Sequence, residues 1–154
     1  MKPRVEWLAD HPDLVDTVIG WHWREWSHGE PGASLDAWRA RLVTRANRDQ
    51  VPFTLVAFVD DEPVGCVSVC HDDVDARYSL EGPWISGMFV VGPARDQGVG
   101  RLLVRAAEDR ARACGAVQLW LWTSEAAAFY ARCDWETVVA KQGLADVTVM
   151  RRAL

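Results

Sequence analysis

A polar turn with two glycines, placed directly after an apolar run, is the stretch of the chain where spacing first points to chemistry. Residues 88–91 are apolar, and residues 95–100 read R-x-x-G-x-G. The pattern predicts a strand, a turn and then a helix. A helix that starts at Gly98 and Gly100 exposes backbone N–H groups and the positive end of its dipole, without a Cβ to hold a ligand away. We therefore expect an anion site, best suited to a phosphate or pyrophosphate.

Two other phosphate-binding patterns do not occur in the sequence. The dinucleotide fingerprint G-x-G-x-x-G is missing, and no Gly-Lys-Ser/Thr follows the glycines as it does in a P-loop. An ordinary strand-turn-helix corner would give the same local pattern as residues 88–104. The rest of the chain has to decide between these two interpretations.

A second motif lies downstream. Residues 95–100 resemble the acetyl-CoA pyrophosphate loop of the GNAT superfamily of N-acetyltransferases, and residues 126–135, AAAFYARCDW, resemble its A-x-x-F-Y-x-x-x-G-F signature. The matching positions are Ala126, Phe129, Tyr130 and, in aromatic form, Trp135. Two motifs in the family's order are far more specific than one, and the resemblance covers nearly the whole chain.

The chain departs from the family pattern at four places. Asp134 stands where the family has glycine, and Thr123 where an asparagine is often found. Trp122 occupies the region of a glutamate base, and Pro93 lies two rather than three residues before Arg95. The first two changes are expected to leave cofactor binding intact, whereas the missing glutamate leaves the general base open.

The resemblance implies acetyl-CoA as co-substrate and no metal. Backbone groups of Met88, Phe89 and Val90 would pair with the pantetheine arm, and the Val90 N–H would donate to the oxyanion. Tyr130 would act as the general acid for the departing thiolate, because a phenol with a pKa of about 10 stays protonated at neutral pH. The cofactor-binding residues implied are Met88, Phe89, Val90, Arg95, Asp96, Gln97, Gly98, Val99, Gly100, Arg101 and Thr123.

The acceptor site is expected near the first two helices of the chain. Trp23, Trp26, His28 and Glu81 are its predicted residues, and the tryptophans with nearby Glu30 would suit a cationic amine. The alternative is that these indoles only pack on the sheet or on a second subunit. The candidates for the general base are Glu81, Asp72, Asp73 and His71, each of which would otherwise be a solvated loop residue.

The remaining pattern predicts one α+β (mixed α/β) domain over residues 1–154. Strands are expected at 3–9, 52–59, 64–70, 84–91, 117–122, 135–140 and 146–152, and helices at about 10–27, 34–47, 98–114 and 125–132. Ser34 is expected to cap the second helix, and 60–63 and 141–143 are expected turns. The resemblance implies that these elements form a mostly antiparallel sheet of about seven strands, with a splayed parallel pair and about four helices.

Composition excludes several classes of protein. The net charge of −5 argues against a nucleic-acid partner, and no apolar run approaches the roughly 20 residues of a membrane helix. The acidic N-terminal stretch is not a signal peptide, so a cytoplasmic location is expected. The four cysteines lack metal-site spacing and are expected to be buried thiols.

The function expected is transfer of an acetyl group from acetyl-CoA to a primary amine of a small molecule or peptide, directly in a ternary complex. The protein would act as a monomer or homodimer. The alternative is a non-catalytic acyl-CoA-binding sensor or partner module. A nucleotide-binding regulatory domain comes last, because the helix after the turn offers no acid to bind a ribose.

Overall fold

The computed structural model describes residues 2–71, 82–139 and 147–154, and these form one seven-stranded sheet in the order β1-β2-β3-β4-β5-β7-β6. Its strands are β1 (Pro3–Trp7), β2 (Phe53–Val59), β3 (Glu62–Cys70), β4 (Trp84–Val90), β5 (Gln118–Thr123), β6 (Glu136–Val139) and β7 (Thr148–Ala153). The α-helices are α1 (Val15–Trp26), α2 (Leu35–Thr44), α3 (Val99–Ala113) and α4 (Ala127–Arg132). All pairings are antiparallel except β4 with β5, so the predicted fold class is confirmed.

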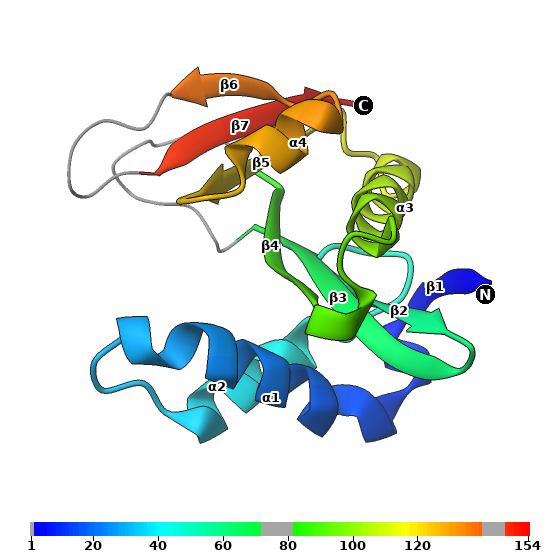
Figure 1. Cartoon of the computed structure of the whole chain (residues 1–154), viewed down its shortest axis with the longest axis vertical. Helices are drawn as coiled ribbons and strands as arrows, with labels where there is room; N and C mark the ends of the chain where they lie inside the picture. The colour runs from blue at the N-terminus through cyan, green and yellow to red at the C-terminus, as the bar shows by residue number, and fades with distance from the viewer. Residues whose placement is uncertain (1, 72–81, 140–146) are drawn as a thin grey trace.

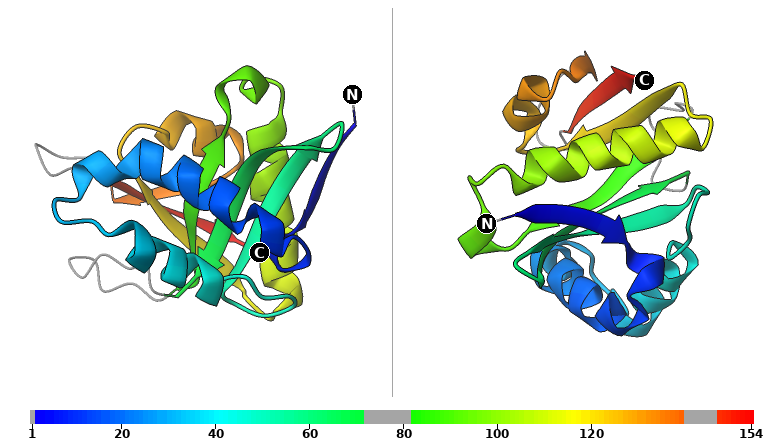
Figure 2. Two further views of the ribbon diagram at one scale, coloured as in Figure 1. Left: turned by 90° about the horizontal axis from the view of Figure 1, so that it is seen from below. Right: turned by 90° about the vertical axis from the view of Figure 1, so that its right-hand side faces the viewer.

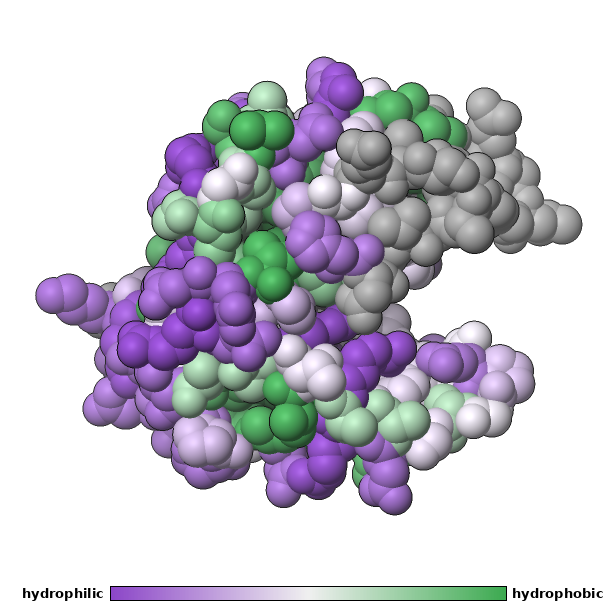
Figure 3. Space-filling view, turned by 180° about the vertical axis from the view of Figure 1, so that it is seen from behind, coloured by the Kyte–Doolittle hydropathy of each residue, from purple (hydrophilic) through white to green (hydrophobic). Residues whose placement is uncertain are grey.

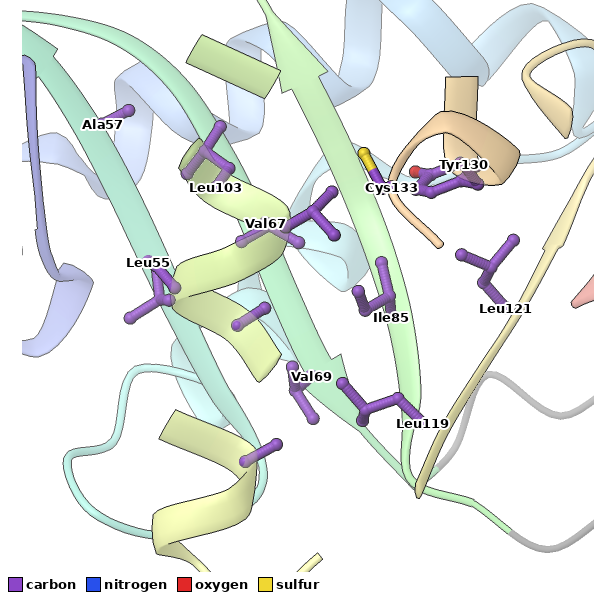
Figure 4. Close-up of a cluster of buried hydrophobic side chains, with 14 of the residues drawn as sticks. Leu55, Ala57, Val67, Val69, Ile85, Leu103, Leu119, Leu121, Tyr130 and Cys133 are labelled. Atoms are coloured by element: carbon purple, nitrogen blue, oxygen red, sulfur yellow. The ribbon is translucent and has the colours of Figure 1, made fainter. Parts of the chain in front are cut away.

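Helices cover both faces of the sheet (Figures 1 and 2). On one face α1 and α2 pack on β2 and β3 through a core that includes Val18, Trp38 and Val56. On the other face α3 and α4 contribute Leu103 and Tyr130 to the larger core. Figure 4 shows this second core, in which side chains of β2, β3, β4 and β5 meet those of α3 and α4.

The sheet opens between β4 and β5. The register of this parallel pair contains one position, Trp84 with Trp120, and the Trp120 N–H donates to the Pro83 carbonyl oxygen at 3.1 Å. Beyond this point the two strands diverge, as the gap between them in Figure 1 indicates. The later part of β4 therefore has no β5 partner for one row of its backbone groups.

Local sequence signals account for several boundaries. The Ser34 hydroxyl accepts a hydrogen bond from the Ala37 N–H at 3.2 Å, which confirms the predicted cap of α2. Asp60 and Asp61 both have positive φ, as a two-residue hairpin turn between β2 and β3 requires. Gly115, with a φ of +94°, follows the end of α3, a position where helices often have a glycine.

Two expectations need correction. The first helix begins at Val15 rather than near residue 10, because two short 3-10 turns, Leu8–Asp10 and Pro12–Leu14, precede it. Leu35 and Val43 recur with Trp38 and Leu42 at the spacing of one helical face, yet they are exposed while the other two are buried. The turn expected at 141–143 lies outside the described residues. In the described part of the chain, no helix has the length and apolar character needed to cross a bilayer.

Candidate active site

The open edge of β4 carries backbone groups that the sheet does not use. The Val91 N–H donates to the Val64 carbonyl oxygen on β3 at 2.9 Å. Backbone groups of an antiparallel strand alternate in direction, so those of Val90 point away from β3, toward the gap before β5. The Val90 carbonyl oxygen accepts a hydrogen bond from the Arg95 Nε at 2.8 Å. Arg95 therefore ties the turn back to the strand that precedes it.

The turn and the first residues of α3 have the backbone geometry expected of an anion site. Asp96 has a φ of +61° and Gly98, the N-cap, a φ of +83°, so two left-handed residues lead into the helix. A Cβ on Gly98 would meet nothing within 4 Å, so the space in front of the helix is open. The first N–H groups of α3 have no carbonyl partner within the helix and face this space. Pyrophosphate remains the ligand predicted for this turn.

Gly100 also has a packing role that the motif did not indicate. A Cβ there would lie 3.1 Å from Cζ of Phe129 and 3.5 Å from Cε of Met88. The glycine therefore allows α3 to pack closely on α4 and β4. Since Phe129 precedes Tyr130, this close contact joins the first motif to the second.

The other predicted cofactor residues lie around the turn and across the gap. The Gln97 side chain donates to the Pro93 carbonyl oxygen at 2.8 Å, so it braces the turn. Arg101 is exposed in the first turn of α3. The Thr123 hydroxyl accepts the Ala126 N–H at 2.9 Å and so caps the segment that enters α4. Thr123 lies on the β5 side of the cavity described next.

A cavity of about 650 Å³ continues from the open edge of β4 toward α1 and α2. Ser86, Gly87 and Met88 line it from β4, and Tyr130 and Thr123 line it from the opposite side. Figure 3 shows the surface hollowed between the half that holds α1 and α2 and the other half of the molecule. The cavity thus joins the second motif, the open strand and the helices that were predicted to hold the acceptor.

Tyr130 reaches this cavity from α4. Its ring packs against Phe129 and Trp135, with centroid distances of 5.0 and 6.0 Å, and its hydroxyl points toward β4 (Figure 4). Within the described part of the chain, no group forms a hydrogen bond with that hydroxyl. Burial raises the pKa of Tyr130 above its ordinary value, so the phenol keeps its proton at neutral pH.

Beneath the bend of β4 lies a small buried network that the sequence did not reveal. His22 on α1 places its Nε2 at 3.2 Å from the Gly87 carbonyl oxygen and at 3.4 Å from the Cys66 Sγ. The carbonyl oxygen can only accept, so Nε2 carries the proton. Gly87 has a φ of +60°, and a Cβ there would lie 3.0 Å from the imidazole ring. The network therefore holds α1 against the point where β4 bends.

Titration of His22 should make the stability of the protein depend on pH. Burial lowers the pKa of His22 from 6.5 to about 4, so the unfolded chain binds a proton below pH 6.5 that the folded protein does not. The free energy of unfolding is expected to fall as the pH drops from 6.5 to 4. Urea denaturation across this range should show a weaker decline for His22→Gln, which can still donate to the Gly87 carbonyl. Equal slopes in the two proteins would contradict the assignment.

The structure brings only some of the predicted acceptor residues to the cavity. Trp26 lines it, whereas Trp23 packs edge-to-face on Trp38 between α1 and α2, and His28 is exposed outside the lining. Glu81 lies outside the described residues.

The candidates predicted for the general base do not line the cavity where the structure describes them. His71 lines a different hollow, beside Cys114, and Asp72 and Asp73 lie outside the described residues. Three carboxylates that do line the cavity are Glu25, Glu30 and Glu125. Glu25 and Glu125 were not singled out from the sequence, because exposed helix and loop acids carry no pattern of their own.

Asp134 and Arg105 have structural roles. Asp134 has a φ of +69°, a conformation that favours glycine and explains why the family pattern has one there. Its carboxylate accepts a hydrogen bond from Arg105 at 2.9 Å, and Arg105 also contacts the buried Glu108 at 3.2 Å. The Arg105 guanidinium therefore faces these two acids rather than the start of α3.

Comparisons with known proteins agree with this geometry. The sequence profile described as the acetyltransferase (GNAT) family matches residues 15–135. A comparison with curated protein sequences finds no match.

Solved structures share the fold at low sequence identity. An aminoglycoside 6'-N-acetyltransferase complexed with coenzyme A has a TM-score of 0.76 at 15% identity, over 99% of this chain and 97% of that one. A second such enzyme, from Enterococcus faecium, has a TM-score of 0.73 at 14% identity, over 97% and 96%. The protein yncA from Salmonella typhimurium, solved with its cofactor acetyl-CoA, has a TM-score of 0.72 at 18% identity, over 99% and 94%.

The profile match spans most of the chain and includes the turn at residues 95–100, the open strand before it and the Phe129-Tyr130 pair. The chain belongs to the acetyltransferase (GNAT) family.

Proposed function

We propose that this protein transfers an acetyl group from acetyl-CoA to a primary amine of a small molecule or peptide, directly and without a covalent enzyme intermediate. The observation that carries the proposal is that Tyr130 and the open edge of β4 at Met88 line one cavity, while the same strand leads on to the open turn before α3. Relatives of the same fold are described with coenzyme A or acetyl-CoA, which supports this choice of donor.

The cofactor would lie along β4 and end at α3. Acetyl-CoA supplies the acetyl group as a thioester. The N–H groups at the start of α3 would bind its pyrophosphate, and the outward backbone groups of Met88 and Val90 would pair with the pantetheine arm. The Val90 N–H remains our predicted oxyanion donor. The Met88 N–H, two residues earlier on the same edge, is a second candidate because Met88 lines the cavity with Tyr130.

The chemical step needs a proton at the sulfur and loses one at the amine. As the new C–N bond forms and the C–S bond breaks, the Tyr130 hydroxyl would give its proton to the departing thiolate. Since burial disfavours the phenolate, Tyr130 would have to regain a proton promptly. The attacking amine releases one, directly or through water or a cavity carboxylate such as Glu25, Glu30 or Glu125.

Thiol release over an amine panel tests the proposal. The protein is mixed with acetyl-CoA and with amino acids, polyamines, aminoglycosides or peptides, and free thiol is followed over time. The proposal requires at least one amine to accelerate release. If none does while acetyl-CoA still raises the melting temperature, the protein is an acyl-CoA-binding module instead. Without any thermal shift, the assignment of the α3 turn fails as well.

Two glycines at the ends of α3 give a matched test of the cofactor site. Gly98 and Gly115 both have positive φ and open space where a Cβ would be added. Alanine at either position should cost about 1 kcal/mol in folding, because both are left-handed. Only Gly98→Ala is expected to weaken acetyl-CoA binding, by roughly 10-fold or about 1.4 kcal/mol. Calorimetric titration measures this difference, and equal affinities in the two variants would contradict the site.

A further inference from the structure

Two arginines from α2 and its C-terminus line the acceptor side of the cavity. Arg41 and Arg45 lie one helical turn apart, and both are among the residues that line it. Arg45 is 8% exposed, and its Nη1 lies 3.5 Å from the Ser86 Oγ on β4. The Arg41 guanidinium lies over the Trp38 ring, 5.6 Å from its centroid. One wall of the cavity is therefore cationic, and part of that charge is buried.

The positive charges of Arg41 and Arg45 also act on His22, another residue that lines the cavity. Both guanidinium groups contribute to the lowered pKa of His22, which contacts Gly87 from α1. Carboxylates line other parts of the cavity: Glu25 on α1, Glu30 after it and Glu125 before α4. The cavity thus presents cations on the α2 side and carboxylates elsewhere. An acceptor with charges of both signs matches this arrangement.

The spacing along β4 suits a small acceptor. Ser86 precedes Met88 by two residues, so a rise of roughly 3.3 Å per residue places their Cα atoms at most about 7 Å apart. An anion bound at Arg45 and Ser86 would thus lie within the length of a short amino acid from an acetyl group held at Met88, the second candidate for the oxyanion donor, whereas an acetyl group held at Val90 would require a longer acceptor. The N–H donors of a planar guanidinium match the two oxygens of a carboxylate. The Ser86 hydroxyl would donate a further hydrogen bond to the same carboxylate.

We propose that the acceptor is an amine that also carries a carboxylate, as amino acids do, and that Arg45, Arg41 and Ser86 bind this carboxylate. The inference rests on the proposed acetyl transfer and names the substrate class for the same site. A polycation such as an aminoglycoside meets two like charges on the α2 wall. Since the carboxylates of Glu25, Glu30 and Glu125 would attract a polycation, a direct comparison of acceptors decides between the two classes.

Matched acceptors test the proposal. With acetyl-CoA saturating, kcat/KM is measured for glycine, β-alanine and γ-aminobutyrate, for the carboxamide of each, and for kanamycin. The wild-type protein should prefer at least one carboxylate over its amide by roughly 10- to 100-fold, as expected for charge-assisted hydrogen bonds. Arg45→Gln should bring this ratio close to one, mainly through KM. Arg39 lies on α2 but outside the cavity, where it pairs with Asp16 of α1, so Arg39→Gln should preserve the ratio.

The outcomes separate the two proposals. Turnover of amides or kanamycin at rates equal to or above those of the carboxylates overturns the substrate class and leaves acetyl transfer standing. An unchanged ratio in Arg45→Gln overturns the role of the arginine. If Arg45→Gln does not fold, Arg41→Gln and Ser86→Ala carry the same comparison, and unchanged ratios in both overturn the carboxylate site. If no acceptor in an extended amine panel accelerates thiol release, the proposed function fails, and this inference with it.

Discussion

Tyr130→Phe should lower kcat by roughly 10²- to 10⁴-fold, the range expected when a general acid is removed. The hydroxyl lies at the cavity and points toward β4, so its loss takes away the proposed proton donor for the thiolate. The ring would stay packed between Phe129 and Trp135, and no hydrogen bond within the described residues would be broken. Acetyl-CoA should therefore raise the melting temperature of the variant as it does that of the wild type.

Cys133→Ala is the control for Tyr130→Phe. Cys133 is buried near Tyr130 (Figure 4), and burial raises the pKa of its thiol, so it is a poor proton donor. Its truncation disturbs the same packing without touching the phenol and should leave most of kcat. A similar loss of kcat in both variants would mean that packing around α4, and not the hydroxyl, supports the reaction. A Tyr130→Phe variant that keeps a third or more of kcat would exclude Tyr130 as the acid.

The order of the elements could be predicted because the signals involved are local. Ser34 at the start of α2, Asp60-Asp61 in the hairpin and Gly115 after α3 each act within a few residues of their own position. Hydrophobic periodicity then separates helices from strands. The two motifs add the family, and with it the parallel pair that opens the sheet.

Contacts between distant segments could not be predicted in this way. His22 contacts Cys66, which lies 44 residues further along the chain, and this contact depends on how α1 packs against β4 near Gly87. Arg45 follows α2 directly and looks like an ordinary solvated end of a helix, yet it is buried beside Ser86. Such pairs depend on sheet register and helix position, which local propensity does not determine.

Glycines illustrate the same limit. Gly98 was identified because it lies in a motif, but Gly65 and Gly87 were not. A Cβ on Gly65 would lie 2.8 Å from the Phe89 carbonyl oxygen and 3.0 Å from Cδ1 of Leu103, so β3 and β4 can approach each other beneath α3 only at a glycine. Because the constraint comes from another strand and a helix, the sequence around Gly65 shows no sign of it.

Glu108 is the clearest case of a residue whose role only the structure shows. It lies on α3 and would be taken for a solvated acid, yet it is 2% exposed. It accepts hydrogen bonds from Arg105 at 3.2 Å and from the Arg152 Nε on β7 at 2.8 Å. Arg152 also donates to the Asp134 carbonyl oxygen at 3.1 Å, in the turn that follows α4. One carboxylate therefore connects α3, β7 and the turn behind Tyr130.

Glu108→Ala is expected to lower the free energy of unfolding by about 3 kcal/mol, since it leaves two guanidinium groups facing each other without their shared acid. Arg105 and Arg152 are each about 30% exposed and can turn partly to water, which keeps the loss at the lower end of the range for buried pairs. In a protein of this size the melting temperature should fall by about 6–12 °C. Asp109→Ala, the neighbouring substitution, removes only the exposed pair with Arg112 and should cost less than about 1 kcal/mol. Urea denaturation of both variants measures the difference. Because Glu108 holds the elements behind α4, Glu108→Ala should also lower kcat by displacing Tyr130. Equal free energies of unfolding in the two variants would mean that Glu108 does not stabilise the contacts between α3, β7 and the turn after α4.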